Sequence, residues 1–213
     1  MKRRFVKWLL LLVVLAFAAY SWQLNTVVQQ GFQQPGASDD LSYEQQPKVV
    51  INMLLLVEDQ SYFEHHGVDV KEILRVLRDY LLTDKPLRGA STITQQLVKN
   101  TLLSREKTLG RKTKEALMAW LLELNFDKTF ILNRYLNTVY LGQQGKRAIR
   151  GFHRASRFYF NKPIERLSLA EVATLVALVK GPSYYHPVKH PKRLAGRRDL
   201  VLQLYHRYQK IVK

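Results

Sequence analysis

Two adjacent carboxylates, Glu58 and Asp59, stand directly after the nearly unbroken apolar segment 49–57. Because an unpaired buried charge is unfavourable, carboxylates in this position must be hydrated, paired or functional. A carboxylate held at the edge of a cleft, out of bulk water, is suited to take a proton as a general base. The same pair is also an ordinary way to end a helix, so the position alone supports both interpretations.

A third carboxylate, Glu115, lies within the helical pattern of residues 108–126, where an apolar stretch begins. Arg111 precedes it by one helical turn and Lys112 by three residues, so the three side chains share one side of the helix. The sequence therefore predicts a carboxylate held among cations at the entrance to the core. A structural ion pair and a functional site both agree with this spacing.

The polar stretch 88–100 predicts the start of another helix. Ser91 or Thr92 can cap its first turn, and Thr92 with Gln95 fits a capping box, in which side chains satisfy free backbone N–H groups. The polar face of this helix carries hydrogen-bonding groups and one cation: Thr92, Gln96, Lys99 and Asn100. We expect either a solvated face or, near the positive end of the helix dipole, the wall of a cleft for an anionic, hydroxyl-rich ligand.

Composition removes several classes of site. The chain has no cysteine, which excludes disulfides, thiolate metal ligands and a cysteine nucleophile. His186 and His190 are four residues apart, but Pro187 and Pro191 argue against a helical metal pair. The formal net charge of +17 in 213 residues requires a polyanionic neighbour, either nucleic acid, an anionic membrane surface or a phosphorylated substrate.

The N-terminus narrows these possibilities. Several Lys and Arg residues precede the apolar run 8–22, which carries aromatic residues at both ends. We expect a basic cytoplasmic tip and one transmembrane anchor over residues 1–24, with the remainder outside the cytoplasm by the positive-inside rule. A signal peptide cleaved after Ala18 is the alternative. Either way the domain is exported, so nucleic acid is not expected as a partner and the basic surface should meet membrane lipids or a lipid-borne phosphate.

The rest of the chain divides into a juxtamembrane linker, 25–47, and one globular domain, 48–213. The linker is rich in Gln, Ser, Asp, Gly and Pro and shows no sustained period. Capping residues predict the starts of further helices: Asp69, Asp127 and Ser168. A last amphipathic helix is expected from Arg197.

Two of these segments carry specific expectations. The helix after Asp69 has apolar residues at helical spacing, which we expect to pack as ordinary scaffold: Val70, Ile73, Leu74, Leu77 and Leu81. The segment 142–157 mixes glycines with basic residues and predicts an irregular lobe. Because no stretch shows convincing strand alternation, the expected fold is mainly α.

Five motifs, in order along the chain, resemble those of the peptidoglycan glycosyltransferases, the family that polymerises lipid II. They are Glu58-Asp-x-x-x-Phe-x-His65-x-Gly67, Gly89-x-Ser-Thr-Ile-Thr-Gln-Gln-Leu-x-Lys-Asn100, Arg111-Lys-x-x-Glu115, Ile131-Leu-x-x-Tyr-Leu-Asn137 and Arg197-Arg-x-x-Val-Leu202. The segment 142–162 and Val179-Lys-Gly-Pro-Ser183 are similar to the glycosyltransferase module of Gram-negative class A penicillin-binding proteins. This chain departs from the family pattern at Tyr62, where the family usually has Phe, and at His186, near which the family commonly has a polar amide.

The resemblance implies an α-helical fold with a lysozyme-like lobe and a smaller membrane-apposed lobe. Because the chain ends where the transpeptidase of those proteins would begin, we expect a monofunctional, membrane-anchored member. Glu58 would be the general base, and Glu115 would act at the leaving diphosphate through Mg²⁺ or Mn²⁺ or a cationic network. The residues that would bind substrate are His65, Ser91, Thr92, Gln96, Lys99, Asn100, Arg111, Lys112, Asn137, Lys180 and Arg197.

The implied reaction joins lipid II units into a β-1,4 glycan with inversion and releases undecaprenyl diphosphate, without an organic cofactor. The implied partners are lipid II, the growing glycan, membrane lipids and cell-wall synthesis or division proteins, at the bacterial inner membrane with the catalytic domain in the periplasm. Two alternatives stay open. An anchored lysozyme-like hydrolase would also use a glutamate but needs no diphosphate clamp, and an inactive scaffold would bind anionic lipid without the catalytic carboxylates.

Overall fold

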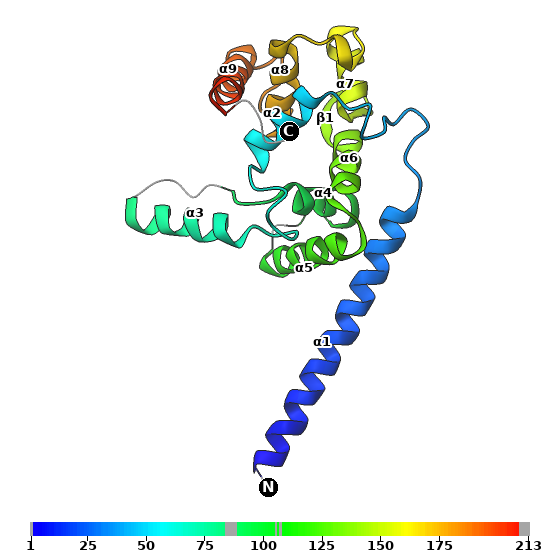
Figure 1. The fold of residues 1–213 in the computed structure, drawn as a ribbon, viewed down its shortest axis with the longest axis vertical. Coiled ribbons are helices and arrows are strands. Elements are labelled where there is room, and N and C mark those ends of the chain that lie inside the picture. The colour runs from blue at the N-terminus through cyan, green and yellow to red at the C-terminus, as the bar shows by residue number, and fades with distance from the viewer. Residues whose placement is uncertain (1, 84–88, 105, 107, 209–213) are drawn as a thin grey trace.

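The structure, a computed structural model, describes residues 2–83, 89–104, 106 and 108–208, so Met1 and Arg88 lie outside the described residues. The mainly α fold is confirmed (Figure 1). The helices are α1 (Lys2–Gln33), α2 (Lys48–Glu58), α3 (Val70–Thr83), α4 (Ile93–Leu102), α5 (Leu109–Asn125), α6 (Lys128–Thr138), α7 (Phe152–Phe160), α8 (Leu169–Val179) and α9 (Pro191–Tyr208), with a short 3-10 helix η1 (Ile164–Arg166). The strands are β1 (Tyr140–Gln144) and β2 (Arg147–Arg150).

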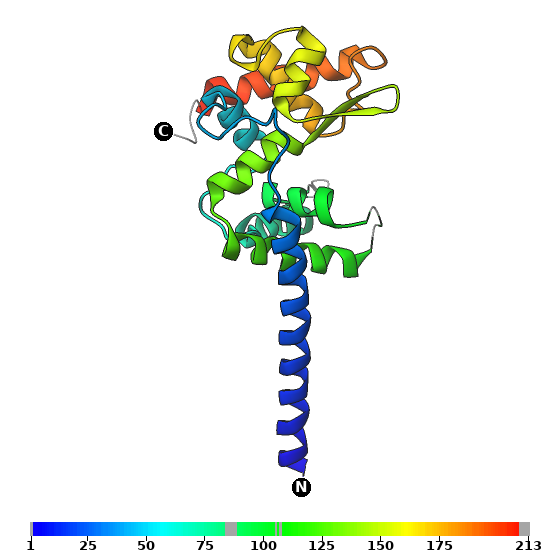
Figure 2. The same ribbon diagram turned by 90° about the vertical axis from the view of Figure 1, so that its right-hand side faces the viewer.

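The helices form two groups that α6 connects (Figures 1 and 2). The upper group contains α2, α7, α8 and α9, and the lower group contains α3, α4 and α5. Because α2 and α8 are apolar on nearly every side, they are buried along most of their length and form the centre of the upper group. The C-terminal end of α2 therefore points from the core toward the boundary between the groups, and Glu58 is its last residue.

Helix α1 extends away from both groups and is long and apolar enough to cross a membrane (Figure 1). It continues to Gln33, well into the segment that we expected to be a linker from residue 25. The physical reason is a stripe at four-residue spacing, Leu24, Val28 and Phe32, whose side chains are at most 3% exposed. The Phe32 ring meets that of Phe126 edge to face at 6.4 Å, so the end of α1 is part of the domain.

The expectation that the apolar face of α3 packs as ordinary scaffold is wrong. Leu74 is 60% exposed and Leu81 is 66% exposed, and Val70, Ile73 and Leu77 are exposed as well. Asp69 accepts a hydrogen bond from the Glu72 N–H at 2.8 Å, so the predicted cap forms. Helical spacing identified the apolar face correctly, but it carries no information about what covers that face.

The segment expected as an irregular lobe begins with a β-hairpin. Strand β1 pairs antiparallel with β2, with Gln144 opposite Arg147 across a two-residue turn. Gly145 opens this turn at φ +57°, a conformation that favours glycine. Only one residue of β2, Ile149, is buried, so the strand has too little alternation to be recognised in the sequence. The hairpin projects from the upper group (Figure 2).

Candidate active site

Glu58 is half-buried at the end of α2 and accepts one hydrogen bond from α4. Its Oε2 accepts from Nε2 of Gln96 at 3.0 Å, and Oε1 of Gln96 accepts from the Tyr135 hydroxyl at 2.8 Å. Burial, with a smaller contribution from Glu58, raises the pKa of Tyr135 well above its ordinary value, so its hydroxyl stays protonated and donates. The amide of Gln96 is thereby fixed with its nitrogen toward Glu58. Oε1 of Glu58 has no partner among the described residues.

Asp59 holds the start of α4 beside Glu58. Its Oδ2 accepts from the backbone N–H of Ile93 at 2.9 Å, which is a favourable place for a negative charge at a helix N-terminus. Nε2 of His65 lies 3.0 and 3.1 Å from the two Asp59 oxygens and is therefore the donating nitrogen. His65 is buried in this contact, so it positions Asp59 and α4.

Glu115 lies in the cationic surroundings that its spacing predicted. The side chain is 1% exposed, with Oε2 accepting from Arg111 at 2.6 Å and Oε1 from Lys112. Lys112 also donates to the Ser91 hydroxyl at 2.9 Å, which joins α5 to the segment before α4. The ion pair is confirmed, and the pairing of both oxygens offsets the cost of burying this carboxylate.

Lys99 connects the two carboxylates electrostatically. Its pKa is lowered, first because the amine is partly withdrawn from water and further by the nearby cations Lys112 and Arg111. Glu115 and Glu58 act on the same amine in the opposite direction. The fold therefore brings Glu58, Glu115 and three cations from α2, α4 and α5 into one site.

Thr92 forms the predicted capping box with Gln95. Its hydroxyl accepts from the Gln95 N–H at 3.1 Å and donates to the Gly67 carbonyl at 2.6 Å. These bonds position α4, and contact between Thr92 and a substrate stays a prediction. Asn100, by contrast, is exposed on α4 one residue after Lys99.

Three predicted site residues lie apart from this cluster. Asn137 is buried and exchanges hydrogen bonds with the backbone of Leu41 at 2.9 and 3.1 Å, so it ties α6 to the segment before α2. Lys180 follows α8 and Arg197 lies on α9. Within the described residues, neither cation contacts Glu58 or Glu115. Nε of Arg197 is buried without a partner there.

Sequence reasoning missed a buried chain of polar groups behind Asp59. Lys128 lies 3.5 Å from Nδ1 of His65 and pairs with Glu123 at 2.8 Å, and Glu123 accepts from the Thr94 hydroxyl at 2.6 Å. The available signal was Glu123 itself, a charged residue in an otherwise apolar stretch of α5. Tyr135 belongs to the fourth motif, and only the structure shows that its hydroxyl reaches Gln96.

The two carboxylates have different chemical capacities. Glu58 has a free oxygen and a neutral donor, so it can accept a proton. Glu115 neutralises and orients cations. A divalent cation is a poor fit to these side chains, because both oxygens of Glu115 are already paired and no group of three His, Asp or Glu residues comes together within the described ranges.

The chain matches known proteins over nearly all of its length outside the apolar N-terminus. The transglycosylase family model matches residues 25–206. Penicillin-binding protein 1B of Haemophilus influenzae is 47% identical over 158 residues, which cover 74% of this chain and 20% of that protein. The same-named proteins of Vibrio cholerae and Escherichia coli are 46% and 45% identical over 77% and 76% of this chain and 21% and 19% of their own. The chain thus spans about a fifth of the length of these curated relatives. Since the family model covers most of its residues, this chain belongs to the transglycosylase family.

Proposed function

We propose that this protein polymerises lipid II into β-1,4-linked glycan strands and releases undecaprenyl diphosphate. One observation carries the proposal: Glu58, with a free oxygen, accepts from Gln96 on α4, and Glu115, with its two paired cations, is joined through Lys112 to Ser91 just before α4. A base and an anion-binding group are the two requirements for sugar transfer from a diphosphate. Family membership supplies the substrate class.

In this reaction Glu58 takes the proton of the acceptor sugar's 4-hydroxyl. The acceptor oxygen forms a bond to the anomeric carbon of the donor as the bond from that carbon to the diphosphate oxygen breaks. A single displacement converts the α-linked donor into a β-linked product. Gln96 keeps Oε2 of Glu58 occupied, so Oε1 is the oxygen that accepts the proton.

Negative charge grows on the departing diphosphate, and the cations on α4 and α5 stabilise it. Lys99 is exposed, while Arg111 and Lys112 are held in place by Glu115 and Ser91. Nε of Arg111 is buried and has no partner within the described residues. Mg²⁺ or Mn²⁺ stays a proposal, without an assigned step. Polymerisation that persists in excess EDTA would exclude a divalent cation from the reaction.

The exposed apolar side chains of the lower group support contact with membrane lipids. Besides α3, the group exposes Trp120 at 46% and Leu124 at 63%, and α1 leaves the domain on α5 beside them. We place the basic N-terminus in the cytoplasm, α1 in the inner membrane and the domain in the periplasm. A C-terminal alkaline phosphatase fusion should be active, and an inactive phosphatase with a fluorescent GFP fusion would contradict this orientation.

Incubating the purified full chain with lipid II tests the function. Glycan strands on a gel, with released undecaprenyl diphosphate, are the expected result, and both should be lost in Glu58→Gln and Glu115→Gln. Failure to consume lipid II would support a scaffold. Cleavage of finished glycan without consumption of lipid II would support a hydrolase.

A further inference from the structure

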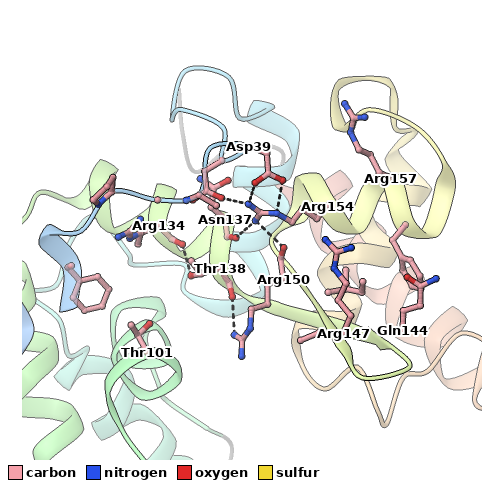
Figure 3. Close-up of a pocket in the computed structure, with 18 of the residues that line it drawn as sticks. Asp39, Thr101, Arg134, Asn137, Thr138, Gln144, Arg147, Arg150, Arg154 and Arg157 are labelled. Atoms are coloured by element: carbon pink, nitrogen blue, oxygen red, sulfur yellow. Dashed lines mark hydrogen bonds and ion pairs between the residues drawn. The ribbon is translucent and has the colours of Figure 1, made fainter. Parts of the chain in front are cut away.

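A cavity lies on the side of α6 that carries Asn137, opposite the side on which Tyr135 meets Gln96. It has a volume of about 860 Å³ and is enclosed by the end of α1, the segment 34–40, the end of α6, the hairpin and α7 (Figure 3). We call it the rear pocket. Tyr135 of α6 faces Gln96 and the active site, whereas Arg134 and Asn137, on the other side of the same helix, line the rear pocket. None of its lining residues contacts Glu58 or Glu115 within the described residues.

The rear pocket is strongly basic. Its lining contains five arginines and two carboxylates: Arg134, Arg147, Arg150, Arg154 and Arg157 with Asp39 and Asp40. Arg154 pairs with both carboxylates, since it donates to Asp39 at 2.9 Å and to Asp40 at 2.7 Å (Figure 3). The side-chain hydrogen bond from Arg154 lowers the pKa of Asp39, so this carboxylate stays charged.

The other arginines have no carboxylate partner among the described residues. Arg134 donates to the carbonyl of Gln34, and Arg150 reaches only the carbonyl of Thr138, at 3.4 Å, and the Tyr140 ring. Arg147 and Arg157 are exposed, and their guanidinium groups have no hydrogen-bond or ion-pair partner among the residues that the structure describes. Cations gathered around a concave surface without counter-charges form a site for an anion.

The chemistry of the lining narrows the ligand. A guanidinium group binds carboxylate or phosphate with two parallel hydrogen bonds. Thr101 and Gln144 add neutral donors and acceptors to the lining, and the exposed ring of Phe158 suits the face of a sugar ring. The volume lies within the range of about 300–1,000 Å³ typical of ligand pockets.

The position of the rear pocket decides between a phosphate ligand and a carboxylate ligand. The arginines of the pocket lie on the end of α6, the hairpin and α7, and the hairpin and α7 lie on the far side of the lower group from the apolar part of α1 (Figure 1). Phospholipid headgroups therefore do not reach them. The diphosphate of lipid II belongs to the active site on the other side of α6. Peptidoglycan strands, in contrast, carry a short peptide with free carboxylates on every repeat.

We propose that the rear pocket binds the carboxylate-bearing peptide stems of a peptidoglycan strand through Arg147, Arg150 and Arg157. The identity of the ligand rests on the proposed function. A strand held there remains attached to the enzyme while the next transfer takes place in front of α6. The strand is either the enzyme's own product or existing wall, and both present the same carboxylates.

Binding is measured on the full chain in detergent, by fluorescence anisotropy with labelled, soluble, uncrosslinked glycan strands. Arg147→Glu should weaken binding about tenfold, because it removes a charge-assisted contact and adds repulsion. Lys146→Glu is the matched control, since Lys146 is the exposed neighbour in the hairpin and does not line the pocket. It should change binding about twofold or less. Arg147→Gln tests the same contact without the repulsion, and thermal unfolding confirms that each variant is folded.

Two further probes identify the recognised group. Strands stripped of their stems by an amidase should bind at least about tenfold more weakly. Equal binding of stripped strands would overturn the proposal, and so would equal effects of Arg147→Glu and Lys146→Glu, which would indicate general surface charge. Tighter binding of a polyglutamate peptide than of intact strands would also overturn it, in favour of an acidic protein segment.

Lipid II polymerisation by the same variants shows whether the bound strand is the enzyme's own product or existing wall. It also separates failure of the rear-pocket proposal from failure of the proposed function. Shorter products from Arg147→Glu at an unchanged initial rate assign the site to the nascent strand, and unchanged product length with lost strand binding assigns it to existing wall. Wild-type protein that polymerises lipid II but does not bind strands removes the rear-pocket proposal alone. Protein that binds strands but does not consume lipid II removes the proposed function alone.

Discussion

Glu58 and Glu115 accept hydrogen bonds from different kinds of donor. Glu58 accepts from the neutral amide of Gln96 and keeps one oxygen free, whereas Glu115 accepts from two cations, Arg111 and Lys112. Both oxygens of Glu115 already accept from cations, so Glu115 offers no free oxygen to a substrate proton, whereas Glu58 does. This difference supports the proposal that Glu58 is the base and that Glu115 holds the cations in place.

Glu58→Gln should reduce polymerisation by about a hundredfold to ten-thousandfold, the usual contribution of general-base catalysis. The Gln amide oxygen can still accept from Gln96, so the site keeps its shape and the affinity for a substrate analogue should change little. Initial rates by gel and analogue binding by anisotropy, on one preparation, measure both quantities. Glu64→Gln, a nearby exposed carboxylate, is the control. A Glu58→Gln rate within about threefold of wild type would exclude Glu58 as the base.

Lys99 makes the alkaline side of the pH profile informative. Because its pKa is lowered, Lys99 loses its charge at a lower pH than an ordinary lysine does, so kcat/KM should fall earlier on the alkaline side. Lys99→Arg keeps the positive charge throughout, since arginine is not deprotonated in proteins, and should move that alkaline limb to higher pH. Steady-state rates across pH measure the shift. Superimposable alkaline limbs for wild type and Lys99→Arg would show that another group controls activity there.

At the residue scale, the sequence predicted contacts that lie within one helix. The spacing of Arg111, Lys112 and Glu115 fixed their proximity, because helix geometry brings residues three and four apart together. It could not reveal that Tyr135, thirty-nine residues after Gln96, donates to that amide. It also could not separate Asn137 from the active site, since that depends on which face of α6 meets the segment before α2.

At the element scale, helices with local signals were predicted and elements set by tertiary contacts were not. Helices α4 and α8 both begin with the capping boxes expected from their sequences. The β1–β2 hairpin depends on a two-residue turn with only Gly145 to mark it. The apolar face of α3 was assigned to the core because soluble domains usually bury such a face, and here it is exposed.

The α3 face should lie in lipid when the protein is in a bilayer. The chain has no cysteine, so a single Leu77→Cys variant can carry an environment-sensitive dye without further changes. In nanodiscs, the dye on Leu77→Cys should emit at a shorter wavelength than the same dye on a position that is exposed to water. Arg75→Cys is the control on the polar side of α3, where Arg75 pairs with Glu72 at 2.7 Å. Equal, water-like emission from both positions would place α3 outside the membrane and leave its apolar face to another partner.

At the scale of the whole molecule, the anchor and the domain are one continuous structure. Helix α1 does not end at the membrane boundary but continues into contacts with α5, where Gln29 donates to Asn125 at 2.7 Å. The segment after it is fixed by Arg154 and by Asn137, which together hold residues 39–41. The height and orientation of the active site above the membrane are therefore set by packing, and a flexible tether would not provide this.

Phe32→Ala tests whether this joint is part of the domain. Phe32 is 1% exposed and packs against Phe126, so its removal should destabilise the chain by about 3–5 kcal/mol, as for other buried phenylalanines. At about 2–4 °C per kcal/mol for a chain of this length, Tm in detergent should fall by on the order of 10 °C. Val27→Ala is the control, because Val27 lies on the same helix at 40% exposure and should shift Tm by less than about 2 °C. If Phe32→Ala and Val27→Ala unfold at the same temperature as wild type, the end of α1 is a tether that the domain does not need, and the orientation of the active site must have another cause.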